Sequence, residues 1–105
     1  MANRKKKSGP PLVIAEDMTI YNAAAQKQRL LDALLATERL EIDLSAVSEI
    51  DTAGFQLLVL VKREARRVDK EALIVAHSEA VREVLDSYNM AAAFGDPLLI
   101  PAVKA

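Results

Sequence analysis

The fold is decided by the stretch LEIDLSAVSEIDTAGFQLL, residues 40–58. Its first five residues alternate between large apolar and acidic side chains, and a period of two is typical of a half-buried β-strand. Apolar residues then recur at the spacing of one face of an α-helix, at Leu57, Leu58, Val61, Ala65 and Val68. The stretch therefore predicts a strand, a connection over residues 45–51 and an amphipathic helix.

Apolar runs and helical stripes alternate on both sides of this stretch. Runs that predict strands lie at residues 12–15, 18–20, 73–76 and 98–100, and stripes that predict helices lie at 22–36 and 78–88. Asn22 and Ser78 are the predicted N-caps of these two helices. The order strand, strand, helix, strand, helix, strand, helix, strand predicts an α/β or mixed α+β fold. We expect an N-terminal antiparallel hairpin, then parallel strands, in one small sheet with helices packed on it.

Composition predicts one soluble domain. The chain has 105 residues, of which 51% are hydrophobic and 28% charged, which suits a single globular core. It contains no cysteine, so disulfides and thiolate metal sites are excluded. The apolar runs are too short to span a bilayer, and no apolar segment typical of a secretion signal follows the N-terminus. We expect a cytoplasmic location, without membrane insertion.

The N-terminus is basic and differs from the rest of the chain. Residues 1–10 include Arg4, Lys5, Lys6 and Lys7 and have no apolar periodicity, so we expect a disordered tail followed by a domain over residues 11–105. The overall net charge is -1, so the body without the four tail charges is near -5. An acidic body repels phosphate backbones, and we expect no nucleic-acid partner for it. Binding of RNA, DNA or anionic lipid by the tail is the secondary interpretation of the basic run.

The motif Asp-Thr-Ala-Gly occupies residues 51–54, between the predicted strand and helix. Free backbone N–H groups and the helix dipole favour negative charge at such a position. Gly54 allows the backbone of a neighbour or a partner to approach closely. The simpler interpretation is that Asp51 or Thr52 is an N-cap and that Gly54 relieves crowding.

Part of the predicted helix lies outside its core stripe. At 100° per residue, Thr52, Phe55 and Val59 fall on one side, flanked by Arg63 and Arg66. Exposed apolar residues beside a hydroxyl and two guanidinium groups are typical of a protein-binding face, although scattered apolar residues also occur on ordinary surfaces. The same face could close a homodimer. The predicted partner-binding residues are Asp51, Thr52, Gly54, Phe55, Val59, Arg63 and Arg66.

Residues 40–58 resemble the core signature of STAS domains, the family named from sulfate transporters and anti-sigma factor antagonists. The resemblance continues into His-Ser-Glu-Ala-Val at residues 77–81 and Phe-Gly-Asp-Pro-Leu at 94–98, and it covers nearly all of the chain except the basic tail. It implies the STAS fold and a role in binding a protein partner, such as an anti-sigma kinase.

The resemblance also bears on regulation. Anti-sigma factor antagonists of this family carry a phosphorylated serine directly before the glycine, where this chain has Ala53. Alanine has no hydroxyl, and Thr52 is therefore the candidate phosphoacceptor of the motif. The Asp-Thr-Ala-Gly form also resembles STAS proteins of chemotaxis gene clusters and the STAS subunit of phospholipid-transporting ABC systems. In the last branch the threonine and the following helix are expected to contact the ATPase subunit, without phosphorylation.

An enzyme is a less favoured interpretation. His77 is the only histidine and cysteine is absent, so the residues for a nucleophile–base arrangement or an ordinary zinc site are sparse. His77 next to Ser78 is predicted to be a helix-start residue. Some STAS domains bind nucleotides, but three glycines leave little room for a glycine-rich phosphate loop. We expect no catalytic residue, cofactor or metal, and a nucleotide-binding module stays an alternative.

A phospho-accepting receiver domain is a second alternative among signalling proteins. The pair Glu16-Asp17 together with Asp51 would have to form its magnesium site. The acceptor aspartate should end a central strand, but Asp43 lies within its strand, and no lysine directly follows the strand at residues 73–76. The receiver is therefore disfavoured.

Overall fold

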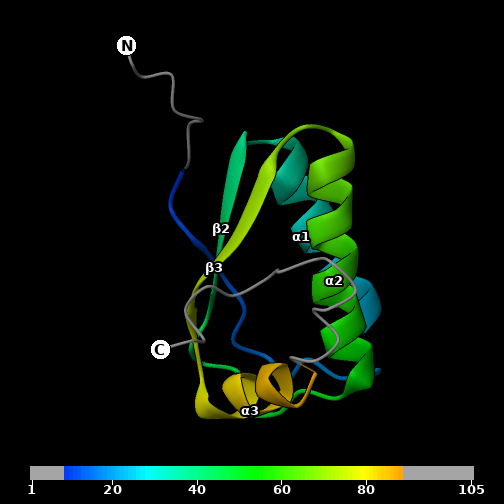
Figure 1. Ribbon diagram of the computed structural model, residues 1–105, viewed down its shortest axis with the longest axis vertical. Helices are drawn as coiled ribbons and strands as arrows, with labels where there is room; N and C mark the ends of the chain where they lie inside the picture. The colour runs from blue at the N-terminus through cyan, green and yellow to red at the C-terminus, as the bar shows by residue number, and fades with distance from the viewer. Residues whose placement is uncertain (1–8, 89–105) are drawn as a thin grey trace.

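A parallel β-sheet with two helices on one side forms the body of the computed structural model, which describes residues 9–88 of the chain (Figure 1). The elements are β1 (Leu12–Val13), α1 (Ala23–Leu35), β2 (Arg39–Leu44), α2 (Thr52–Arg67), β3 (Glu71–His77) and α3 (Glu79–Ser87). Helices α1 and α2 lie side by side along the sheet, and α3 lies across one end of it (Figure 1). This arrangement confirms the predicted α/β class.

The three strands of the described part run in the order β1-β2-β3, and both pairs are parallel. Ile42 at the centre of β2 lies opposite Leu12 on one side and Ile74 on the other. Because the strands are parallel, the segments that follow them all emerge at the same edge of the sheet. The connections that lead into α1, α2 and α3 therefore meet at one end of the molecule.

The predicted antiparallel hairpin does not form, which corrects one detail of the expected fold. Of its two predicted strands, only Leu12–Val13 joins the sheet, in parallel with β2, and Met18 makes a single parallel bridge to Ile50. The intervening residues lack the Asn-Gly or Gly-rich pair that a tight hairpin needs. Met18 pairs instead with the connection before α2: its N–H donates to the Glu49 carbonyl at 2.8 Å, and its carbonyl accepts from the Asp51 N–H at 3.1 Å. The predicted strand at residues 98–100 lies outside the described residues.

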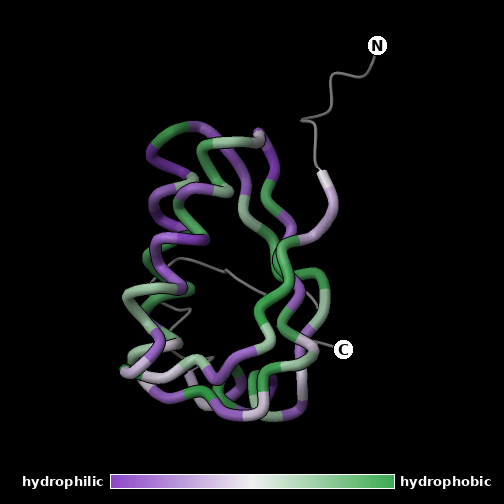
Figure 2. Tube along the Cα trace, turned by 180° about the vertical axis from the view of Figure 1, so that it is seen from behind, coloured by the Kyte–Doolittle hydropathy of each residue, from purple (hydrophilic) through white to green (hydrophobic). Residues whose placement is uncertain are grey.

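The core lies between the sheet and the two long helices. The alternation in β2 buries Leu40, Ile42 and Leu44, as predicted. The predicted stripe of α2 is also confirmed, with Leu57, Leu58, Val61 and Ala65 buried. Apolar stretches follow the strands, while hydrophilic residues recur along the helices (Figure 2). The leucines of α1 differ in burial: Leu30 and Leu34 are buried, whereas Leu35 is 69% exposed.

The side chains of the two predicted N-caps, Ser78 and Asn22, make different hydrogen bonds. Ser78 caps α3 as expected, because its hydroxyl accepts from the Val81 N–H at 3.2 Å. Asn22 occupies the N-cap position of α1 but makes no capping bond, and its amide donates instead to the Asp17 carbonyl at 2.8 Å. The Asn22 side chain therefore fixes the preceding loop rather than the first turn of the helix.

Gly54 permits a close contact between α2 and the loop after β1. A methyl group built at this buried position would overlap the Met18 carbonyl oxygen and would lie 2.9 Å from the Ile50 side chain. The backbone of Met18 is hydrogen-bonded to residues 49 and 51, and these bonds hold its carbonyl group in place. The first turn of α2 thus packs directly on a backbone, which only glycine allows here.

Gly54→Ala should destabilise the protein, although alanine ordinarily favours a helix interior. Because the added methyl group overlaps a fixed carbonyl, we expect the free energy of unfolding to fall by about 1–3 kcal/mol in urea denaturation. Gly9→Ala is the matched control, since a methyl group there meets no atom within 4 Å. Equal stability of both variants would show that the contact is not tight.

Candidate functional site

The residues singled out by the sequence lie at the edge of the sheet where the strands end. Residues 51–54 form the N-cap and first turn of α2, close to the loop before α1 and to α3 (Figure 1). Asp51 and Thr52 are exposed, Phe55 is half-buried and Gly54 is buried. We call the surface formed by Asp51, Thr52, Phe55 and Tyr88 the Asp51 face.

Asp51 joins the first turn of α2 to the loop before α1. One carboxylate oxygen, Oδ1, accepts the Gly54 N–H at 3.0 Å, which confirms the predicted N-cap. The other, Oδ2, accepts the Ile20 N–H at 3.1 Å. The hydrogen bond from Gly54, with a smaller contribution from Ile20, holds the pKa of the Asp51 carboxyl below its ordinary value. The carboxylate is therefore kept ionised by structural bonds that fix two segments together.

Thr52 stands at the first position of α2 and contacts the end of α3. Its hydroxyl lies 3.2 Å from the Tyr88 hydroxyl, at hydrogen-bonding distance. The Tyr88 ring also stacks on Phe55, with ring centroids 4.2 Å apart and an angle of 14° between the planes. Tyr88 thus covers part of the first turn of α2 and orients the threonine side chain.

The structure brings only some of the predicted partner-binding residues together. Val59 is half-buried, while Arg63 and Arg66 are exposed but lie farther along α2. Thr52 and Arg63 are eleven positions apart, which is about 16 Å at the rise of an α-helix. Phe55 packs against the core as well as against Tyr88, so it serves stability in addition to any contact. The Asp51 face and the two arginines therefore belong to opposite ends of the helix.

Tyr88 and Ile20 contact Thr52 and Asp51, but they are absent from the predicted partner-binding residues. The periodicity of residues 81–88 assigns Tyr88 to the inner stripe of α3, and no local pattern places it against Phe55. Ile20 was expected within a strand, but it lies in a loop and is 67% exposed. The apolar run at residues 18–20 is short for a strand, and this shortness is the only sequence signal for a loop at Ile20.

A cluster of metal-binding side chains is not assembled in the described part of the chain. Residues 9–88 contain no cluster of three or more acidic or histidine side chains that could hold a metal ion. His77 is the last residue of β3 and not part of α3, which corrects its predicted place. Asp43 lies within β2, as predicted, and its carboxylate accepts the Ser45 N–H at 2.9 Å. Within the same residues no helix is long and apolar enough to cross a bilayer.

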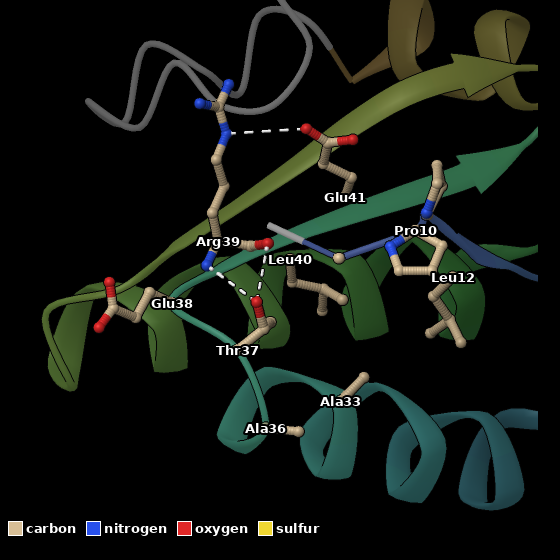
Figure 3. Close-up of a pocket in the computed structure, with 11 residues that line it drawn as sticks. Pro10, Leu12, Ala33, Ala36, Thr37, Glu38, Arg39, Leu40 and Glu41 are labelled. Carbon is tan, nitrogen blue, oxygen red and sulfur yellow. Dashed lines mark hydrogen bonds and ion pairs between the residues drawn. The ribbon is translucent and has the colours of Figure 1, made fainter. Parts of the chain in front are cut away.

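A groove of about 710 Å³ lies at the other end of the sheet, away from the Asp51 face. It is formed by the segment before β1, the last turn of α1 and the start of β2. Figure 3 shows Leu12 and Leu40 pointing from the strands toward Ala33 on α1, with the ion pair of Arg39 and Glu41 on the opposite side of β2. None of the predicted partner-binding residues lines this groove.

Comparison with known proteins identifies the family. The family model described as "Mlab, STAS domain" matches residues 1–101. The chain belongs to the STAS domain family. Among solved structures, this STAS domain is similar to a candidate anti-sigma factor antagonist from Thermotoga maritima, with a TM-score of 0.62 and 18% sequence identity. The alignment covers 83% of this chain and 79% of that chain, and at this identity it shows a shared fold.

The charge of Asp51 should make the stability of this STAS domain depend on pH. A carboxyl whose pKa is lowered by folding adds stability above its unfolded pKa of about 3.9, and this stability is lost as the pH falls through the folded value. Asn can still cap the helix but carries no charge. We therefore expect Asp51→Asn to have a lower Tm than the native protein at neutral pH and a smaller fall in Tm between about pH 5 and pH 3.

Glu38→Gln controls for the removal of a charge, because Glu38 is an exposed carboxylate at the opposite edge of the sheet. Circular dichroism melts of the three proteins across this pH range make the comparison. Parallel profiles for native protein and Asp51→Asn would mean that the Asp51 carboxylate does not stabilise the fold through its charge.

Proposed function

We propose that this STAS domain is a non-catalytic regulatory module that binds a protein partner through the Asp51 face. The observation that carries the proposal is the placement of Thr52, which is exposed at the start of α2 while its neighbours Asp51 and Gly54 are fixed by the fold. A polar side chain held in this way offers a partner a surface of defined shape at little cost in conformational entropy.

The mixture of side chains on the Asp51 face supports a protein partner. The Asp51 face combines a carboxylate, a hydroxyl and two stacked aromatic rings. Mixed polar and aromatic surfaces of this kind are common at the centres of protein interfaces.

The proposal includes regulation by phosphorylation of Thr52. Such regulation would resemble that of anti-sigma factor antagonists and would belong to a bacterial signalling system such as chemotaxis. Ala53 occupies the usual acceptor position, and the Thr52 hydroxyl is the one that the motif offers. A phosphate would carry roughly -1.5 to -2 charges at the helix N-terminus. It would also stand beside the ionised Asp51 carboxylate and replace the contact with Tyr88. We expect this change to weaken binding of a partner that recognises the unmodified face.

The second candidate is a STAS subunit that binds the ATPase of a phospholipid-transporting ABC system. The Asp-Thr-Ala-Gly motif at residues 51–54 and the match to the Mlab-type family model favour this branch. Here Thr52 and the first turn of α2 serve as a constant contact, and no modification is needed. Both branches use the same face, and they differ in the partner.

Thr52→Arg should abolish binding of the true partner without unfolding the domain, because the position is exposed and only the Tyr88 contact is lost. The probes are the purified ATPase subunit of the phospholipid-transporting ABC system and the purified signalling kinases encoded in the same genome. We expect one of them to co-elute with the native protein and with the control Glu38→Arg, but not with Thr52→Arg. Equal capture of all three proteins would contradict the proposed face.

Mass spectrometry distinguishes the two branches. If the domain is a phosphorylated switch, incubation with ATP and the kinase that binds it should place phosphate on Thr52, and Thr52→Val should remain unmodified. Phosphate on another residue, or none, together with stable binding of the ATPase subunit, would instead support the transport branch.

A further inference from the structure

Two large apolar side chains stand unburied next to the Asp51 face. Ile20 is 67% exposed and Tyr21 is 91% exposed. They lie in the loop between β1 and α1, and the hydrogen bond from the Ile20 N–H to the Asp51 carboxylate places this loop beside Thr52. We call residues 16–22 the anchor loop.

The anchor loop is fixed although its tip is exposed. Met18, two residues before Ile20, is fully buried and its backbone pairs with residues 49 and 51. The Asp17 carbonyl accepts the Asn22 side-chain amide at 2.8 Å and the buried Gln26 amide at 3.0 Å. Bonds from α1, from the connection before α2 and from Asp51 therefore hold the loop from several sides.

A fixed loop with exposed apolar side chains has the properties of an interface anchor. Exposing apolar surface to water is unfavourable, and covering it with a partner recovers that free energy. A loop that is already ordered loses little further entropy when it binds. Tyrosine is also enriched among the residues that dominate binding energy. The structure thus presents Ile20 and Tyr21 in the manner expected of contact residues.

The charges around the anchor loop define the partner surface that would fit it. Residues 16–22 and 48–52 carry the acidic side chains of Glu16, Asp17, Glu49 and Asp51 and no basic one. Glu16 is paired with Arg29 at 3.2 Å. The remaining carboxylates leave the rim negative, and complementary charges favour correct docking and faster association.

We propose that Ile20 and Tyr21 are the apolar anchors of the partner-binding surface, and that the protein partner receives them in an apolar pocket bordered by lysine and arginine side chains. The inference rests on the proposed function and adds to it a second segment of this chain and the chemistry of the partner. Thr52 and the anchor loop then form one continuous surface across Asp51.

The test measures the Kd of purified variants by biolayer interferometry, with the partner protein captured in the Thr52 experiment as the probe. Ile20→Ser and Tyr21→Ser should each weaken binding by about tenfold or more, as expected for truncated anchors. Leu35→Ser is the matched control, because Leu35 is 69% exposed, also apolar, and lies at the far end of α1. We expect its Kd to stay within about twofold of the native value. Urea unfolding of each variant checks that the fold is kept.

Charge reversal tests the basic border. Glu49→Arg should weaken binding, whereas Glu38→Arg, an exposed site at the opposite edge of the sheet, should not. Raising the salt concentration from about 0.1 M to 1 M should weaken native binding, since it shortens the screening length from about 10 Å to 3 Å. Stronger binding by Glu49→Arg would overturn the assignment of a basic partner surface.

The outcomes separate this inference from the proposed function. If Thr52→Arg abolishes binding while Ile20→Ser and Tyr21→Ser bind as the native protein does, the anchors are wrong and the proposed face stands. If the serine variants lose binding and Thr52→Arg does not, the anchor loop is the docking surface and the role of Thr52 is overturned. Loss of self-association in the serine variants, measured by gel filtration, would assign the anchors to a second copy of this chain and overturn the proposal of a different partner.

Discussion

The backbone of Met18 carries the contact on which the end of the molecule around the Asp51 face depends. It pairs with residues 49 and 51 on either side of Ile50, and the first turn of α2 packs against its carbonyl at Gly54. The Asp51 carboxylate reinforces the same junction, since it binds the N–H groups of Gly54 and Ile20. Helix α2 and the anchor loop are therefore positioned by one set of backbone contacts, and neither can shift alone. The surface around Thr52 inherits its shape from this junction.

Periodicity predicts the elements that bury one regular face. The alternation from residue 40 to 44, the stripe of α2 and the caps at Asp51 and Ser78 depend on neighbours in sequence, and the structure agrees with each. The segment after β1 is different, because its backbone finds partners about thirty residues away. The apolar run at residues 18–20 is too short for its pattern to show these distant partners. Its composition alone therefore predicts a strand.

The candidate site was predictable in its centre but not at its borders. The motif at residues 51–54 predicts a helix start with an accessible Thr52, as found. Tyr88 and Ile20 join it through contacts that span 36 and 31 residues. Contacts of this length depend on how α3 and the anchor loop pack, and no local pattern encodes them. Arg63 and Arg66, which stay predicted partner-binding residues, lie away from this centre, because residues on one side of a helix need not be neighbours along its length.

The stacking of Tyr88 on Phe55 has a practical consequence, because the chain contains two tyrosines and no tryptophan. The second tyrosine, Tyr21, stands 91% exposed on the anchor loop. Both tyrosines of the protein thus lie at the same end of the sheet, one beside Thr52 and one in solvent near Asp51. Tyrosine emission from the unlabelled protein consequently reports on this end of the sheet. It should change when a partner covers Tyr21 or Tyr88.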